Sequence, residues 1–173
     1  MTKNSPELSV YKKTVSGKWL VCDVQSLLYN HRMTAHKFSI PIKVRYSDLD
    51  AQWHVNHTRF LTFIEQARLE YLQHLGLFDG KSFLDLRVII ADVHVSFIAP
   101  ISLGQKVRVS TRTMKIGNKS ITFEYILEDT DSEKMLAKGE VICVTYNFRN
   151  QKTVPVPPEW RNKIAEFEGR SFD

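Results

Sequence analysis

Residues 56–76 read NHTRFLTFIEQARLEYLQHLG, and their apolar members recur every three or four positions. This spacing predicts an α-helix with one apolar face, made of Phe60, Ile64, Ala67, Tyr71 and Leu75. Asn56 can cap the start of such a helix, and Gly76 suits the left-handed turn that ends one. The helix would be about 28 Å long, enough to cross a small sheet.

Strand patterns lie on both sides of this helix. Before it, Ile40, Ile42 and Val44 alternate with polar positions over residues 37–46. After it come four further strand candidates, at residues 86–97, 106–115, 120–128 and 135–147. Turn-forming residues separate them, and such short connections predict an antiparallel meander. One amphipathic helix needs a sheet to cover its apolar face, so we predict an α+β hotdog fold, a five-stranded antiparallel sheet wrapped around one long helix.

These patterns predict one domain over residues 37–150. Residues 1–36 show only a short apolar patch at 19–24, so we expect an N-terminal extension outside the native domain, with Met33 as a candidate natural start. Residues 151–173 should form a tail with a short surface helix at 159–167.

The composition limits the classes of function. The 173 residues are 43% hydrophobic and 25% charged, with a net charge of +5 and two cysteines. No apolar run reaches the length of a membrane span and no signal peptide is apparent, so we expect a cytoplasmic protein with reduced thiols. The positive charge favours an anionic partner, which could be nucleic acid, a membrane surface or a phosphorylated small molecule. The basic residues are scattered rather than clustered, which argues against nucleic acid.

Polar functional groups concentrate between the first strand and the helix, in YSDLDAQWHVNH at residues 46–57. Asp48, Asp50, His54 and His57 lie there, just before a helix start with unpaired N–H groups. A carboxylate beside such donors has both parts of an acyl-transfer site, a base or nucleophile and an oxyanion cradle. The same groups could instead be turn, capping or surface residues.

The motif YSDLD, followed by HVN at 54–56 and by Phe60, Glu65, Ala67 and Arg68, resembles the signature of the 4-hydroxybenzoyl-CoA thioesterase family. The resemblance covers residues 37–150. It implies that Asp50 is the catalytic carboxylate and that His57, and by likeness to plant acyl-carrier-protein thioesterases His54, takes part in catalysis. Trp53 stands where the family usually has glycine.

The resemblance also implies the substrate, the partners and the binding residues. We expect hydrolysis of a fatty or aromatic acyl-CoA, with Asp50 either activating water or attacking the thioester. No cofactor is expected, because CoA is part of the substrate, and no metal. We expect a homodimer or homotetramer with sites between subunits. A non-catalytic acyl-CoA-binding protein and an enoyl-CoA hydratase are the alternatives. Lys119 and Ser120 lie in a turn that resembles the one placed against the coenzyme A nucleotide in the family. Independently of the resemblance, the apolar Trp53, Phe60 and Phe63 are candidates to line an acyl pocket, and Glu65 could help to position water.

Overall fold

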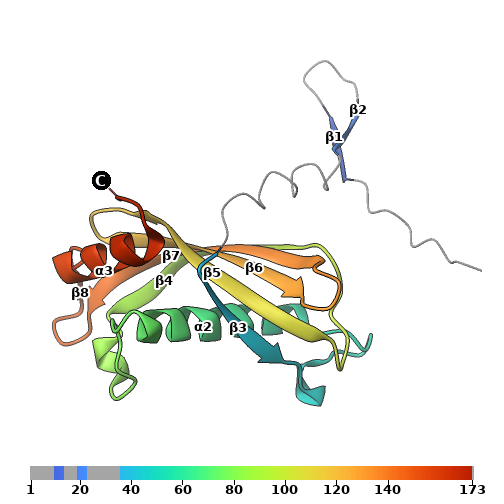
Figure 1. The fold of residues 1–173 in the computed structure, drawn as a ribbon, viewed down its shortest axis with the longest axis horizontal. Helices are drawn as coiled ribbons and strands as arrows, with labels where there is room; N and C mark the ends of the chain where they lie inside the picture. Colours follow the sequence, from blue (N-terminus) through green and yellow to red (C-terminus); the bar gives the residue numbers. More distant parts are fainter. Residues whose placement is uncertain (1–9, 14–18, 23–35, 173) are drawn as a thin grey trace, which may run out of the picture. The chain divides into compact units, whose positions relative to one another are not determined.

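The computed structural model describes residues 10–13, 19–22 and 36–172 (Figure 1). The chain divides into two compact units, Met1–Ala35 and His36–Asp173. In the first unit, β1 (Val10–Lys13) pairs with β2 (Trp19–Cys22) as an antiparallel hairpin. The candidate start at Met33 lies outside the described residues.

The second unit contains one antiparallel sheet. Its strands are β3 (Phe38–Lys43), β4 (Val88–Phe97), β5 (Lys106–Ile116), β6 (Ser120–Asp129), β7 (Met135–Asn147) and β8 (Lys152–Thr153). The order across the sheet is β3-β5-β6-β7-β4, and the short β8 pairs with β7. Each expected strand is present, and the hotdog prediction is confirmed.

The helix α2 (His57–His74) lies against one side of this curved sheet (Figure 1). The Asn56 side chain accepts a hydrogen bond from the Thr58 N–H at 3.0 Å, which caps the helix as predicted. Gly76 follows the helix with φ of 63°. The predicted face is buried, with Ile64, Ala67 and Tyr71 at most 2% exposed.

The close packing of α2 on the sheet depends on Gly139 of β7. A Cβ atom at this position would lie 2.9 Å from Ile64 Cδ1 and 3.6 Å from Val95 Cγ2. A contact closer than 3.0 Å would force the Ile64 side chain to shift, so glycine lets the helix approach the strand without this displacement.

The predicted four-strand meander is wrong in one respect, because β4 does not pair with β5. It pairs with β7 at the opposite edge, and only β5, β6 and β7 form a meander. The connection over residues 98–105 can extend up to about 26 Å, whereas three strand spacings measure about 14 Å. A short connection therefore does not require neighbouring strands.

The C-terminal helix α3 (Pro158–Glu168) forms where a surface helix was expected, but its inner face joins the core. Trp160 and Ile164 are 4% and 0% exposed. The Tyr71 hydroxyl on α2 donates to Glu168 at 2.7 Å, and the Glu168 carboxylate also accepts the Thr113 N–H at 2.9 Å. Residues 36–172 thus share one core, and in the described part of the chain no helix is long and apolar enough to cross a membrane.

Candidate active site

The loop between β3 and α2 begins with a short 3-10 helix, η2 (Tyr46–Asp48). Asp48 is completely buried, and its carboxylate accepts hydrogen bonds from the Arg45 N–H at 2.8 Å and from the Arg45 guanidinium at 3.2 and 3.3 Å. Arg59 of α2 lies 3.7 Å away. Burial raises the pKa of Asp48, but the Arg45 hydrogen bonds and both guanidinium groups lower it further, so the net shift is downward. Asp48 therefore braces the loop.

Asp50 lies in a tight turn directly after this brace. Its N–H donates to His54 O at 2.9 Å, and Trp53 N–H donates to Asp50 O at 3.0 Å. Asp50 Oδ1 accepts the Gln52 N–H at 2.8 Å and the His54 N–H at 3.4 Å. These bonds orient the carboxylate, and within residues 36–172 Oδ2 has no hydrogen-bond partner. Trp53 closes the turn with φ of 62°, a conformation that favours glycine.

A pocket of about 320 Å³ adjoins Asp50 and Trp53. Its lining residues are Tyr46, Ser47, Leu49, Asp50, Ala51 and Trp53. The Tyr46 and Trp53 rings lie edge to face, 6.3 Å apart, and both are largely exposed. The pocket therefore combines an oriented carboxylate with an aromatic wall.

The site loop is fixed to the β4–β5 crossover. Val55 N–H donates to Ile101 O at 2.8 Å, and His54 forms a β-bridge with Ser102. The exposed His57 starts α2, and its ring lies 6.4 Å from the Phe97 ring. His54 is partly buried. Asp50, His54 and His57 are thus held around the helix start.

Two of the expected pocket residues lie in the core instead. Phe60 and Phe63 are each 3% exposed, and Phe60 packs on the Phe97 ring at 5.1 Å. Neither lines the Asp50 pocket. The spacing of aromatic residues predicts that they lie on the inner face of a helix. It does not show whether they pack in the core or line a pocket.

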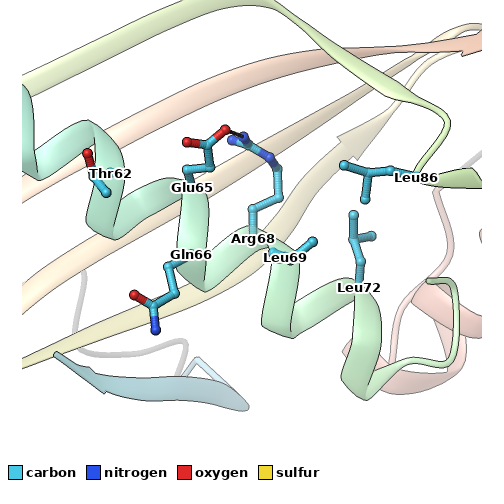
Figure 2. A pocket seen from close by; sticks show the side chains of 7 residues that line it. All are labelled: Thr62, Glu65, Gln66, Arg68, Leu69, Leu72 and Leu86. Atoms are coloured by element: carbon cyan, nitrogen blue, oxygen red, sulfur yellow. Dashed lines mark ion pairs between the residues drawn. The ribbon is translucent and has the colours of Figure 1, made fainter. Parts of the chain in front are cut away.

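Glu65 lines a second hollow, a groove on α2 of about 320 Å³ (Figure 2). Its lining residues are Thr62, Glu65, Gln66, Arg68, Leu69, Leu72 and Leu86. The Glu65 carboxylate points toward the Arg68 guanidinium at 3.8 Å. In the sequence Arg68 stood out only as part of the family motif, although it occupies a position on the buried side of α2. A charged residue at a buried helix position was the sequence signal that could have indicated this groove.

Lys119 and Ser120 lie at the opposite end of the sheet from Asp50. Lys43, just before the site loop, pairs with Lys106, whereas the β5–β6 turn follows the pair Ile116 and Ile121. The intervening length of β5 corresponds to about 33 Å. Lys119 Nζ is 3.2 Å from Thr153 Oγ1. One chain therefore does not bring these residues to its own Asp50.

Among residues 10–13, 19–22 and 36–172, no three His, Cys, Asp or Glu side chains are grouped so that they could hold a metal ion. Asp48 is already occupied by arginine, which removes it from the potential ligands near Asp50.

The chain is similar to proteins of known activity and structure. An acyl-CoA thioesterase, YbgC, from Haemophilus influenzae is 30% identical over 73% of this chain and 93% of its own. The long-chain acyl-CoA thioesterase FadM of Escherichia coli is 22% identical over 72% of this chain and 95% of its own. The crystal structure of a Thermus thermophilus thioesterase complexed with coenzyme A and Zn is 28% identical, with a TM-score of 0.67 over 76% of this chain and 94% of that one. The model of the thioesterase-like superfamily matches residues 44–164, and the chain belongs to this superfamily.

Proposed function

We propose that this protein hydrolyses the thioester bond of a fatty or aromatic acyl-CoA, giving a free acid and CoA. The observation that carries the proposal is the Asp50 carboxylate, oriented by two backbone N–H groups and lining a pocket at the start of α2. The names of the relatives support the same reaction class.

In the proposed reaction Asp50 either removes a proton from the attacking water or attacks the thioester carbon itself, forming an acyl anhydride that water then hydrolyses to the free acid and the Asp50 carboxylate. In both routes the C–S bond breaks and the sulfur leaves as thiolate, whose pKa is about 8.5 by analogy with cysteine. A strong general acid is therefore unnecessary. The free Oδ2 of Asp50 is the atom available for either role.

The start of α2 supplies the groups that stabilise the developing oxyanion. The Asn56 side chain satisfies the Thr58 N–H, whereas the His57 N–H has no acceptor among residues 36–172. This unpaired donor at the positive end of the helix dipole is our candidate oxyanion donor. We assign the His54 and His57 imidazoles to orienting substrate or water, and the exposed Trp53 to the entrance of the acyl pocket.

We further propose that the active unit is a homodimer, or a tetramer built from such dimers. The edge strand β4 leaves the apolar Ile90, Val93 and Phe97 between 39% and 52% exposed. An edge with free backbone groups and apolar side chains pairs readily with a second copy. The second copy is also the source of Lys119 and Ser120 for the CoA phosphates, because these residues are remote from Asp50 in one chain.

No cofactor or metal takes part in the proposed reaction. The buried free thiol of Cys143 and a CoA thioester substrate fit a reducing compartment, so we propose a cytoplasmic location.

The test is release of thiol from a panel of acyl-CoAs, followed with a thiol-reactive dye. Asp50→Asn should lower kcat by about 10² to 10⁴, the usual value of a positioned base, with an unchanged circular dichroism spectrum. A folded variant with kcat within a few-fold of wild type would exclude Asp50 as the catalytic group. Binding without thiol release would indicate a non-catalytic acyl-CoA-binding protein, and hydration of enoyl-CoA without thiol release a hydratase.

A further inference from the structure

The groove on α2 has apolar walls and a charged floor. Leu69 and Leu72 form one wall, and Leu86, before β4, faces Leu72 across the groove (Figure 2). Of its two charged members, Glu65 is exposed and Arg68 is only 7% exposed. A buried guanidinium at the base of an open apolar groove is costly unless an acceptor pairs with it.

The acceptors available to Arg68 within residues 36–172 are insufficient. A guanidinium carries five N–H donors, and the nearest carboxylate oxygen, from Glu65, is 3.8 Å away, beyond hydrogen-bond length. The Glu65 side chain is also 68% exposed, so water weakens the attraction. On the inner side Arg68 faces the completely buried hydroxyl of Tyr125, which offers it one acceptor. A single hydroxyl cannot accept from five donors, so most of the Arg68 N–H groups lack an acceptor within residues 36–172.

The groove lies along α2, and the proposed reaction site lies just before the first residue of this helix. His57, the first residue of α2, contacts Phe97 at the end of β4, and Leu72, near the other end of the helix, lines the groove with Leu86. Arg68 follows His57 by eleven positions, which corresponds to about 16 Å along the helix axis. A long acyl chain whose thioester is at the start of α2 can therefore reach Arg68.

We propose that this groove holds the acyl chain and that Arg68 binds a carboxylate at its far end, so that ω-carboxyacyl-CoAs are the preferred substrates. The proposal rests on the thioesterase function and names its substrate class. The planar guanidinium matches a carboxylate with two parallel hydrogen bonds, which a neutral hydroxyl does not provide. The exposed Glu65 side chain is free to turn toward solvent when the substrate carboxylate enters.

The first experiment compares kcat/KM for matched pairs of substrates, dodecanedioyl-CoA against dodecanoyl-CoA and hexadecanedioyl-CoA against hexadecanoyl-CoA. A hydrogen-bonded charged group contributes enough to favour the ω-carboxylated member by about tenfold or more at one of the lengths. Equal rates, or a preference for the unsubstituted chains, would overturn the proposal while leaving thioesterase activity established.

Arg68→Met keeps the aliphatic stem and removes the charge, so it should abolish the preference and leave hydrolysis of the unsubstituted chains within a few-fold. Arg68→Lys should retain part of the preference. Lys163→Met is the matched control, because Lys163 is a cation of α3 that does not line the groove. It contacts Glu159 and the Gly76 carbonyl instead. A preference that survives in folded Arg68→Met would overturn the proposal, and if that variant fails to fold, the wild-type comparison decides it.

Calorimetry with S-alkyl-CoA thioethers, with and without an ω-carboxyl group, separates this proposal from the proposed hydrolysis. These compounds have no thioester, so their binding does not depend on catalysis. Binding should be about tenfold tighter with the ω-carboxyl group. Equal binding would contradict the assignment of Arg68 even in an active enzyme, and a difference without any thiol release would contradict the hydrolysis alone.

Discussion

Asp48 and Asp50 are two residues apart, yet their carboxylates have opposite surroundings. Asp48 is completely buried and bound by Arg45 and Arg59, whereas Asp50 is partly exposed and bound only by backbone N–H groups. The first is arranged to hold the loop, and the second to meet a substrate. This difference separates their expected mutational effects.

Asp48→Asn should lower the free energy of unfolding by about 1 to 3 kcal/mol, because a buried amide cannot accept all the hydrogen bonds that the Asp48 carboxylate accepts from Arg45. Urea denaturation at neutral pH measures this change. Hydrolysis per folded molecule should stay within a few-fold of wild type. A large loss of kcat at unchanged stability would instead give Asp48 a chemical role.

The same carboxylate predicts sensitivity to acid. The pKa of Asp48 is lowered from 3.8, so the stability that its charge contributes is present above this value and is lost as the pH falls through the folded pKa. The unfolding free energy of wild type should therefore fall below about pH 4, and Asp48→Asn should show a shallower fall. Urea midpoints across this range test the expectation, and parallel curves for the two proteins would refute it.

Lys119→Ala should raise KM for acyl-CoA with little change in kcat, and more visibly at low salt, where phosphate attraction is less screened. Because Lys119 is remote from Asp50 within one chain, mixed oligomers provide a sharper test. Combining Asp50→Asn subunits with Lys119→Ala subunits should create one site with both native residues and restore low-KM activity. Absence of restoration would argue against a site shared between subunits.

The edge strand β4 predicts how the subunits associate. Light scattering of wild type should give a mass of at least twice 20.1 kDa at micromolar concentration. Val93→Lys places a charge on this edge and should shift the mass toward the monomer. Leu84→Lys is the control, since Leu84 is 59% exposed but lies outside β4. A wild-type monomer would contradict the proposed dimer.

The Tyr71–Glu168 bond predicts sensitivity to alkali. Burial, followed by the nearby Glu168 charge, raises the pKa of Tyr71 above its ordinary value. The neutral phenol thus contributes stability that is complete below the unfolded pKa of about 10 and is lost as the pH rises above it. Wild type should lose unfolding free energy above about pH 10 more steeply than Tyr71→Phe, as urea midpoints would show. Equal slopes would contradict the assignment.

The sequence predicted where the strands and the helix lie along the chain better than it predicted which strands pair with each other. Alternation in β3 and the three-to-four spacing in α2 arise from local burial, so they are visible in one segment. The pairing of β4 with β7 depends on a crossover that no local pattern records. The role of Trp160 and Ile164 in the core was missed for the same reason. The predicted boundaries at residues 36 and 150 stay predictions.

The candidate site was predicted where its residues are contiguous. The segment 46–57 folds into one loop, so Asp50, His54 and Trp53 are neighbours in space as in sequence. Phe60 and Phe63 were expected in a pocket but lie in the core, since helical spacing alone does not separate these places. The groove at Arg68 needed the structure, because Leu86 reaches it from a separate segment.

The contact between Gly139 and Ile64 restricts how this protein can diversify. A methyl group on Gly139 has space only if the Cδ1 atom of Ile64 shifts or is removed, so Gly139→Ala is expected to cost less stability together with Ile64→Val than alone. The two positions should therefore change together among descendants of this sequence, although they lie far apart along the chain. A mutational library that varies both positions should recover the paired change more often than Gly139→Ala by itself.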